Sequence, residues 1–307
     1  MRIAFCFPGQ GSQRAGMGRE LAEEVPAAAA VFEQANEAVG FDLRQICFEG
    51  SLEELSRTEI TQPALVAASL AALAAVADSG ALRADVVVGH SVGEYAALAA
   101  AEAAPAAEML RLVHERGRVS AEAAGGGGMA AVLKLTDEQV EQLCAARDDV
   151  WPANYNCPGQ VVISGRDEGI DAVAEGAAAA GGKVIRLKVS GAFHSPLMAD
   201  AADRFAPAVR AAAFTPFATP FMSTVTSELE TVDRVPGLLV AQLTAPVRFT
   251  QAVRSLVAGG VDTFVELGPG GVLAGLVRRI DDSVRTFSIA SPADLAAVQE
   301  VMSGGRS

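Results

Sequence analysis

The chain has 307 residues, half of them hydrophobic, which supplies enough apolar material for a large core and argues against intrinsic disorder. Its 24 Lys and Arg residues are outnumbered by 37 Asp and Glu residues, and the net charge of -13 disfavours general attraction to nucleic acid or to anionic membranes. The four cysteines, at positions 6, 47, 144 and 157, lack metal-binding or redox spacing and indicate reduced thiols in a cytosolic protein.

Strand and helix patterns alternate in the first part of the chain, which predicts an α/β architecture. A first buried strand, RIAFCF, enters the glycine loop PGQGSQ, and a second strand at 85–89 runs into GHSVG. The apolar stretch from Pro63 to Ala77 is short and rich in alanine, so a buried helix is favoured over a membrane span. Pro105 suits the first position of a helix that is predicted to run to about Ala123.

The composition changes at a GGGG run, residues 125–128, which predicts a hinge. Beyond it we expect a strand (MAAVLKL) and a helix with Thr136 as its N-cap and Gln139 at capping-box spacing. Two strands (VWPANYN and QVVISG), a second helix and a last strand (KVIRLKV) follow. The order βαββαβ is that of a ferredoxin-like unit.

The main body is predicted to resume after this unit. A helix with Ser195 as its expected N-cap comes first, followed by a strand, a glycine loop and a helix in VDTFVELGPGGVLAGLVRRI, and by a last strand, TFSIA. The closing SGGRS is expected to fray. We therefore expect a small subdomain at 128–190, inserted into a large subdomain formed by 1–127 and 191–307.

The pentapeptide GHSVG is the first candidate for chemistry. It places Ser91 between two glycines at a strand-to-helix turn, which fits a nucleophile elbow. The glycines permit the sharp turn, and the N-terminus of the following helix directs amides towards a developing oxyanion. A simple structural turn is the alternative interpretation, and the strand–turn–helix context favours a nucleophile.

Among the three histidines, His194 is the best candidate for a base, because it lies in a loop between a strand and a helix, where α/β sheets form active sites. A loop histidine that caps the next helix is the alternative. His90 adjoins the serine and is interpreted as a packing or hydrogen-bonding residue, and His114 as a residue at the surface or the edge of the core. No acid after Ser91 stands out as a third member, which favours a Ser–His dyad.

The helix that begins at Pro105 carries a cation on its apolar stripe. Arg116 shares this stripe with Met109, Leu112, Val113 and Val119. Burial without a partner would be costly, and a guanidinium fork suits the carboxylate of a ligand. The alternative is a side chain whose stem extends between helices to carry its charge into solvent.

The chain also contains, in order from about residue 3 to 290, the motifs FPGQGSQ, ITQPALVAAS, GHSVGEYAAL, RLVHERG, NYNCPGQVVISG, GAFHSPLM, AQLTAPVRF and ELGPGGVL. They resemble the motifs of the malonyl-CoA:acyl carrier protein transacylase family, which polyketide synthase acyltransferase domains share. The resemblance implies an α/β-hydrolase-like large subdomain with an inserted ferredoxin-like small subdomain, in agreement with the pattern above.

The resemblance also implies roles for individual residues. Ser91 is implied as the nucleophile, His194 as the base and Arg116 as the clamp for the malonyl carboxylate. The backbone amides of Gln10 and Val92 would form the oxyanion hole. The backbone carbonyl of Gln242 would orient the histidine, which accounts for the missing acid.

The implied reaction transfers a malonyl group from malonyl-CoA to the phosphopantetheine thiol of acyl carrier protein, through a malonyl-serine intermediate in a ping-pong mechanism. It serves fatty acid or polyketide synthesis. No metal or redox cofactor is expected, and the CoA thioester is a substrate. The expected partners are acyl carrier protein and malonyl-CoA, with neither nucleic acid nor membrane, and a cytoplasmic monomer is expected. A serine hydrolase such as a thioesterase is one alternative, but it has no use for Arg116. A catalytically silent carrier-protein binder is another, and the intact Ser91, His194 and Arg116 set argues against it.

Two further residue groups are predicted to set specificity. Phe193, in GAFH, is expected to wall the pocket beside the malonyl α-carbon and to exclude an α-methyl group, although packing of the loop is the alternative. Lys183, Arg186 and Lys188 lie on the last strand of the insert, and strand alternation places Arg186 and Lys188 on one face. They are predicted to dock an acidic carrier protein, and a solvated edge strand is the alternative.

Overall fold

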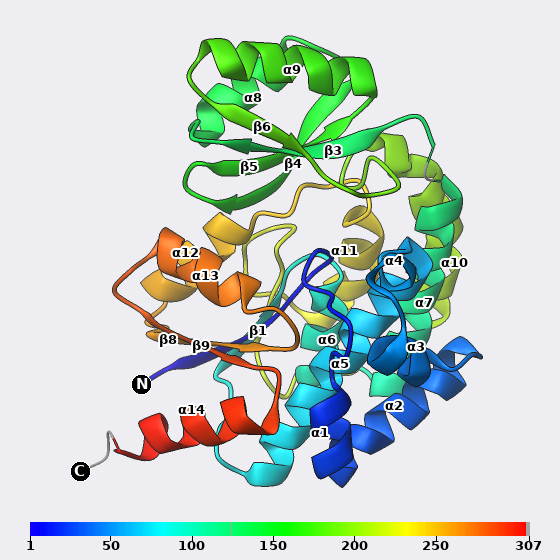
Figure 1. Cartoon of the computed structure of the whole chain (residues 1–307), viewed down its shortest axis with the longest axis vertical. Coiled ribbons are helices and arrows are strands. Elements are labelled where there is room, and N and C mark those ends of the chain that lie inside the picture. Colours follow the sequence, from blue (N-terminus) through cyan, green and yellow to red (C-terminus); the bar gives the residue numbers. More distant parts are fainter. Residues whose placement is uncertain (124, 305–307) are drawn as a thin grey trace.

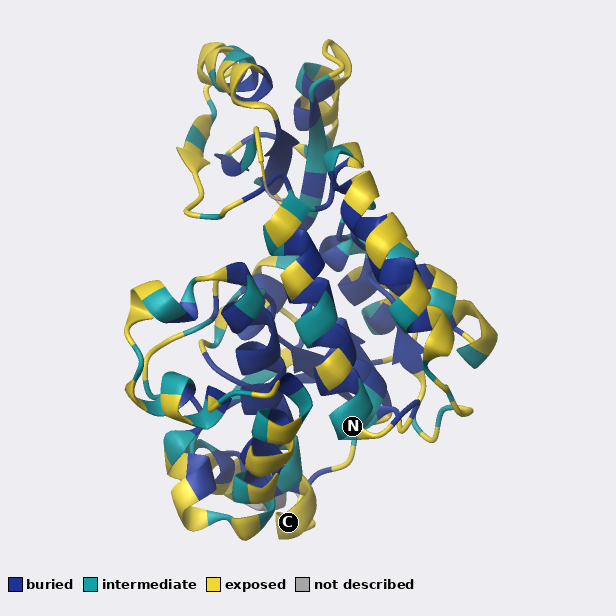
Figure 2. Ribbon diagram, turned by 90° about the vertical axis from the view of Figure 1, so that its right-hand side faces the viewer, coloured by how far each residue is buried: buried dark blue, intermediate teal, exposed yellow. Residues whose placement is uncertain are grey.

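The structure is a computed structural model that describes residues 1–123 and 125–304. Its strands form one five-stranded parallel sheet and one four-stranded antiparallel sheet, in two parts of the molecule (Figure 1). Buried residues fill both parts (Figure 2). The mixed α/β fold expected from the alternating pattern is therefore present, with the parallel sheet in the larger part.

The parallel sheet has the strand order β7-β2-β1-β8-β9. Its central strands are short and buried along their whole length, as expected for a sheet with helices on both faces. The predicted strands at both ends of the chain are confirmed as its members. Its strands are β1 (Ile3–Phe7), β2 (Val86–Gly89), β7 (Phe221–Met222), β8 (Thr263–Leu267) and β9 (Arg285–Ile289).

Helices cover both faces of this sheet. One face packs on a large apolar cluster built mainly from α2, α5, α6, α7 and α10, and the other packs on α12 and α13. Helix α5 is long and apolar enough to cross a membrane, but 83% of its most apolar window is buried within the protein, which confirms the predicted core helix. The helices of this part are α1 (Arg19–Glu24), α2 (Pro26–Val39), α3 (Leu43–Glu49), α4 (Leu52–Leu55), α5 (Thr58–Ser79), α6 (Gly93–Ala100), α7 (Ala106–Ala123), α10 (Ala199–Ala211), α11 (Val235–Ala241), α12 (Phe249–Ala258), α13 (Val272–Ile280) and α14 (Pro292–Gly304), with the short 3₁₀ helices η1 (Pro196–Met198) and η2 (Val232–Arg234).

The antiparallel sheet has the strand order β4-β5-β3-β6. Its strands are β3 (Gly128–Leu133), β4 (Val150–Cys157), β5 (Gln160–Gly165) and β6 (Lys183–Arg186), and its helices are α8 (Asp137–Ala145) and α9 (Asp167–Ala179). Both helices pack on one face, away from the larger part (Figure 1). The predicted capping box of α8 is confirmed, because Thr136 and Gln139 each bond the backbone of the other.

The smaller sheet is joined to the larger part by a backbone bridge. The amide of Tyr155 donates to the carbonyl of Val247 at 2.8 Å, and the amide of Val247 donates to the carbonyl of Ala153 at 2.8 Å. Glycine is required at 127 on the other connection, because a Cβ there would lie 2.5 Å from the carbonyl oxygen of Gly165. Strand β4 therefore lies next to the segment that leads into α12.

Three details differ from the expectations. Strand β6 ends at Arg186 rather than continuing to 189, and Ser190 then bonds Thr58 of α5 at 2.8 Å, so the chain has turned towards the larger part. The hydroxyl of Ser195 donates to the carbonyl of Ala192 and does not cap the helix, which begins with the 3₁₀ turn η1. Helix α14 extends to Gly304, and the rest of the predicted frayed tail lies outside the described residues.

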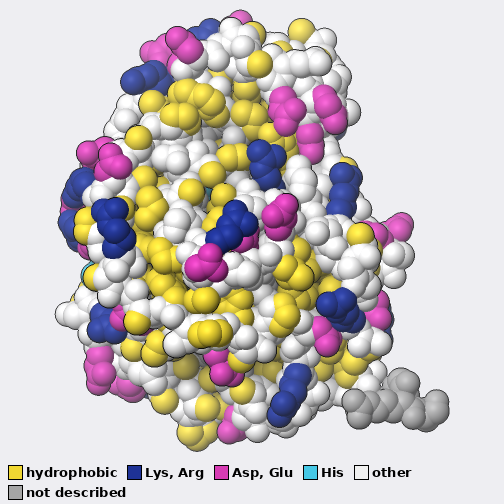
Figure 3. All heavy atoms as spheres, turned by 180° about the vertical axis from the view of Figure 1, so that it is seen from behind, with side chains coloured by type: hydrophobic (Ala, Val, Ile, Leu, Met, Phe, Trp, Pro, Cys, Tyr) yellow, Lys and Arg dark blue, Asp and Glu magenta, His cyan; other side chains and the backbone are white. Residues whose placement is uncertain are grey.

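The burial of the cysteines and the distribution of surface charge bear on the sequence predictions. All four cysteines are free and buried. Charges of both signs are interspersed with hydrophobic side chains over the face seen in Figure 3, so the net negative charge is not segregated there. The exposed large hydrophobic residues of the described chain are Met1, Leu52, Ile185, Leu187, Leu229, Val272 and Val301.

Candidate active site

The turn between β2 and α6 holds Ser91 in a strained backbone conformation. Its φ of 51° lies in the left-handed region, which is uncommon for a residue other than glycine and is found at functional turns. The flanking glycines are required sterically. A Cβ at Gly89 would lie 2.2 Å from the amide nitrogen of Glu94, and one at Gly93 would lie 2.0 Å from the carbonyl oxygen of Phe7. The local sequence thus forms the sharp elbow that the pattern predicted.

His194 lies directly against this serine. Its Nε2 is 2.7 Å from Ser91 Oγ, and its Nδ1 is 2.9 Å from the carbonyl oxygen of Gln242 and 3.1 Å from that of Ala245. Carbonyl oxygens only accept, so Nδ1 carries the proton and Nε2 is left to accept one from the serine hydroxyl. Two motifs 103 residues apart in the sequence therefore meet, and a backbone carbonyl stands where many serine enzymes have a carboxylate.

The environment keeps His194 neutral. Burial first, and then the nearby Arg116 and His90, lower the pKa of His194 to about 3, while the bonds to the two carbonyls oppose the shift. The imidazole is therefore unprotonated at Nε2 at neutral pH and free to accept the proton of Ser91. Its position is as strained as that of the serine, with a φ of 60°.

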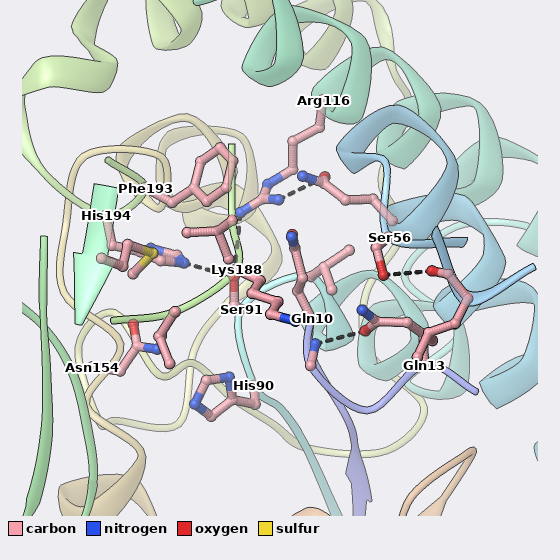
Figure 4. A pocket seen from close by; sticks show the side chains of 17 residues that line it. Gln10, Gln13, Ser56, His90, Ser91, Arg116, Asn154, Lys188, Phe193 and His194 are labelled. Carbon is pink, nitrogen blue, oxygen red and sulfur yellow. Dashed lines mark hydrogen bonds between the residues drawn. The ribbon is translucent and has the colours of Figure 1, made fainter. Parts of the chain in front are cut away.

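Arg116, on α7, extends its guanidinium into the same pocket, towards Ser91 (Figure 4). It is only 5% exposed, so the alternative of a side chain that reaches solvent is wrong. Its Nη1 donates to Gln62 Oε1 at 2.7 Å, its Nη2 reaches Ser91 Oγ at 3.4 Å, and its Nε has no partner. Within the described part of the chain, no carboxylate forms an ion pair with it. Burial lowers the pKa of Arg116, an effect that the charges of Tyr95 and Glu94 oppose.

Two backbone amides beside the serine have no internal acceptor. In the described ranges, the N–H groups of Gln10 and Val92 make no hydrogen bond, although both residues line the pocket. Val92 is the N-cap residue of α6, so its amide belongs to the positive end of that helix. Unpaired donors next to a nucleophile are what an oxyanion hole requires.

The pocket has a volume of about 360 Å³ and lies between the two parts of the molecule. Phe193 is half-buried and forms part of its wall. The sequence analysis gave no role to Gln62 and Asn154, although both lie in its motifs and both line the pocket. His90 forms a hydrogen bond with Asn156 at 2.8 Å, as expected for a hydrogen-bonding residue. The lining residues include Gln10, Leu52, Ser56, Gln62, His90, Ser91, Val92, Arg116, Met129, Asn154, Leu187, Lys188, Phe193 and His194.

Comparisons with known proteins agree with this site. The family model described as the acyl transferase domain matches residues 4–298. The malonyl CoA-acyl carrier protein transacylase of Bacillus subtilis (strain 168) is 42% identical over 95% of this chain and 94% of its own length. That of Escherichia coli (strain K12) is 38% identical over 98% of this chain and 99% of its own length.

Solved structures give the same result. A malonyl CoA-acyl carrier protein transacylase from Clostridium perfringens superimposes with a TM-score of 0.95 at 33% identity, covering 99% of this chain and 98% of that one. A malonyl-transacylase in complex with a type II PKS acyl-carrier protein superimposes with a TM-score of 0.94 at 35% identity, covering 98% and 100%. The chain therefore belongs to the malonyl-CoA–acyl carrier protein transacylase family, within the wider family of acyl transferase domains.

Proposed function

We propose that this protein transfers the malonyl group of malonyl-CoA to the phosphopantetheine thiol of acyl carrier protein, for fatty acid or polyketide synthesis. One observation carries the proposal: the oxygen of Ser91 lies 2.7 Å from a neutral histidine and 3.4 Å from a buried arginine that lacks a carboxylate. The names of the relatives and the neighbour solved with a carrier protein support the same substrates.

The first half-reaction acylates Ser91. His194 Nε2 accepts the hydroxyl proton as the oxygen attacks the thioester carbonyl carbon, and the amides of Gln10 and Val92 hold the resulting oxyanion. The tetrahedral intermediate collapses, the C–S bond breaks, and the CoA sulfur leaves with the proton from His194. The products are a malonyl-serine ester and free CoA, with the carbonyl of Gln242 keeping the imidazole in place.

The second half-reaction reverses these roles with another thiol. His194 takes the proton of the carrier thiol, the sulfur attacks the serine ester, and the serine oxygen leaves with that proton. Arg116 holds the malonyl carboxylate in both halves, which a general thioesterase would not need. Phe193 limits the space beside the α-carbon, so malonyl is the expected group and methylmalonyl the excluded one.

The finer description of the fold is also part of this proposal. We assign 1–127 and 191–307 to an α/β-hydrolase-like subdomain and 128–190 to a ferredoxin-like one. The order βαββαβ, the sheet order β4-β5-β3-β6 and the two helices on one face support the second assignment. Four free, buried cysteines support a location in the cytoplasm. The proton transfers described above balance without a metal or redox cofactor. A monomer remains a prediction.

Mass spectrometry of the Ser91 peptide tests the function. After mixing with malonyl-CoA, the native protein should carry a malonyl group on this peptide and should lose it on addition of carrier protein with its phosphopantetheine. Ser91→Ala should not be labelled, while its folding and its binding of the CoA thioester are retained. Labelling that persists in the variant, or a label that water removes as fast as the carrier does, would contradict the proposal.

A further inference from the structure

A buried carboxylate beside the nucleophile is not used by the mechanism above. Glu94 lies on the first turn of α6 and is 1% exposed. One of its oxygens, Oε1, accepts from the amide and the hydroxyl of Thr224 at 2.5 and 2.7 Å and from the hydroxyl of Ser223 at 3.2 Å. The other, Oε2, accepts from Nε2 of Gln242 at 2.5 Å.

Gln242 connects this carboxylate to the catalytic pair. Its Nε2 also donates to the carbonyl of Ser91 at 3.2 Å, and its own backbone oxygen accepts from Nδ1 of His194 at 2.9 Å. The backbone carbonyl of Ser91 can only accept, so it fixes which end of the Gln242 amide points towards it and Glu94. The side chain therefore fixes Gln242 against α6, while its backbone faces the histidine.

The carbonyls that face the histidine come from the turn that follows α11. Gln242 is the first residue after α11, and the second carbonyl, that of Ala245, lies in the same turn. The turn is also held by bonds to its own helix, as in the amide of Gln242 donating to Leu238, by the amide of His194 donating to Leu243, and just beyond it by the bridge from Val247 to β4. Glu94 is the anchor that ties this turn to the helix of the nucleophile.

We infer that Glu94 is a positioning residue for acyl transfer: it holds Gln242 so that the backbone carbonyl of that residue fixes the tautomer and the orientation of His194. The inference rests on the proposed function, since it names a further participant in the same site. It also explains why an ionisable group stays in a place where its burial is costly. In many serine enzymes a carboxylate contacts the histidine directly, whereas here the carboxylate of Glu94 acts on His194 through Gln242.

The size of the effect follows from two comparisons. Removing the carboxylate that touches the histidine in a serine protease lowers turnover about 10⁴-fold through the wrong tautomer. A displacement of about 1 Å at a reacting group costs about 100-fold. Because both carbonyls remain when Glu94 is altered, the smaller figure applies, and substrate binding should be spared.

Glu94→Gln is the primary variant. If the amide oxygen of the new side chain accepts from Thr224, its NH2 group faces the NH2 group of Gln242. The side-chain amide of Gln242 must then rotate, and it loses its hydrogen bond to the carbonyl of Ser91. We expect kcat for malonyl transfer to fall about 100-fold, with KM for malonyl-CoA changed by less than about twofold. Gln242→Leu tests the link from its other end and leaves the Thr224 bonds of Glu94 intact. The double variant should be no slower than either single one.

Glu266→Gln is the matched control. Glu266, on β8, is as buried as Glu94, and in the described part of the chain its carboxylate accepts from the amide of Ala274 at 2.9 Å and makes no hydrogen bond with Ser91 or His194. Its variant should keep kcat within about threefold. A loss in this control as large as that in Glu94→Gln would mean that any buried acid is needed for folding, and would overturn the inference.

Proton NMR gives a readout that does not depend on malonyl transfer. The Nδ1 proton of His194, identified by its absence in His194→Asn, should give a downfield signal that moves or broadens in Glu94→Gln and Gln242→Leu but not in the control. Reaction of Ser91 with p-nitrophenyl acetate should slow in the same variants. An unchanged signal with native rates, or additive losses in the double variant, would overturn the inference. A native protein that fails to transfer malonyl but shows these effects would overturn only the proposed function.

Discussion

At the scale of single residues, Arg116 has bonding capacity that the protein leaves unused. Among the described residues its Nε has no partner, its short hydrogen bond goes to the neutral Gln62 and a longer one to Ser91, and Tyr95 lies beneath its guanidinium at 5.9 Å. A charge held in this way, without a carboxylate, is stabilised most when a ligand supplies one. The sequence predicted this residue well, because a cation on an apolar helical stripe is visible without a structure.

Replacing Arg116 should change which acyl group is accepted. Removal of one partner of a buried charge pair costs roughly 2–5 kcal/mol, so Arg116→Ala should lose about 30-fold or more in kcat/KM with malonyl-CoA. Its activity with acetyl-CoA, which has no carboxylate to leave unpaired, should rise relative to malonyl. Initial rates with both thioesters measure this directly, and equal losses on the two substrates would assign Arg116 a structural role.

Glu94 and Gln242 show where residue-level prediction stops. Both contribute through contacts between segments far apart in the chain, and Gln242 acts on the histidine through a backbone carbonyl, which any amino acid carries. A pattern of side chains contains no signal for such a role, so only the family resemblance pointed to Gln242. Nothing in the sequence distinguished Glu94 from an ordinary acidic residue in the first turn of a helix.

At the scale of elements, local signals predicted the elbow and the capping box, but the end of β6 depended on tertiary contacts. The strand stops where the chain turns towards α5, and Arg186 is bound to Asp167 and Asp171 of α9. Its charge is thus already paired on the helical side of the sheet, and it does not form a docking face with Lys188, which lines the pocket. The predicted basic patch therefore has to be revised.

In place of the basic patch, we expect the carrier protein to dock on an apolar lip beside the pocket, formed by Ile185, Leu187 and Leu52. Ile185 pairs with Ala131 in the sheet, so it lies on the face that looks towards the pocket, and it is 42% exposed. Leu187, two residues further, and Leu52 of α4 are exposed at the mouth itself. A carrier protein that delivers its arm to Ser91 must cover this lip, whereas Ile185 lies outside the pocket that receives the CoA thioester.

Ile185→Glu should therefore impair the carrier step alone. Truncation of an interface residue that contributes to binding costs more than about 1 kcal/mol, and a charge buried there adds to this cost, so KM for carrier protein should rise about tenfold while KM for malonyl-CoA is unchanged. Leu229→Glu is the matched control, since Leu229 is an apolar residue with 55% exposure that does not line the pocket. Arg186→Glu should also leave both constants unchanged. A raised carrier KM in Arg186→Glu with none in Ile185→Glu would restore the original basic patch.

At the scale of the whole molecule, the site exists only because two sheets come together. Ser91 and Arg116 belong to the first part of the chain, Asn154 to β4 of the smaller sheet, and His194 to the segment that returns from it. The alternation of strands and helices predicted both sheets, but the bridge between Tyr155 and Val247 joins residues whose separation leaves no local pattern. Which faces meet is decided by such long-range contacts.

The same assembly buries two ionisable groups whose effects on stability oppose each other. Burial lowers the pKa of His194 from 6.5 to about 3, so the unfolded chain binds the extra proton below pH 6.5 and stability falls with falling pH. Burial raises the pKa of Glu94 from 4.5 to about 7, against the hydrogen bonds from Thr224, Ser223 and Gln242. Between those values the folded protein binds the extra proton, and stability rises with falling pH.

Single variants should separate these two contributions. One pKa unit corresponds to about 1.4 kcal/mol, so between pH 7 and pH 5 each group changes the free energy of unfolding by about 2 kcal/mol, with opposite signs. Compared with the native protein over this interval, His194→Asn should gain about 2 kcal/mol as the pH falls, and Glu94→Gln should lose about 2 kcal/mol. Urea unfolding at both pH values measures the differences, and the double variant should follow the native pH dependence, because two opposing terms are removed together. Parallel curves for the native protein and both single variants would mean that neither group titrates differently on folding, and would contradict both the lowered pKa of His194 and the raised pKa of Glu94.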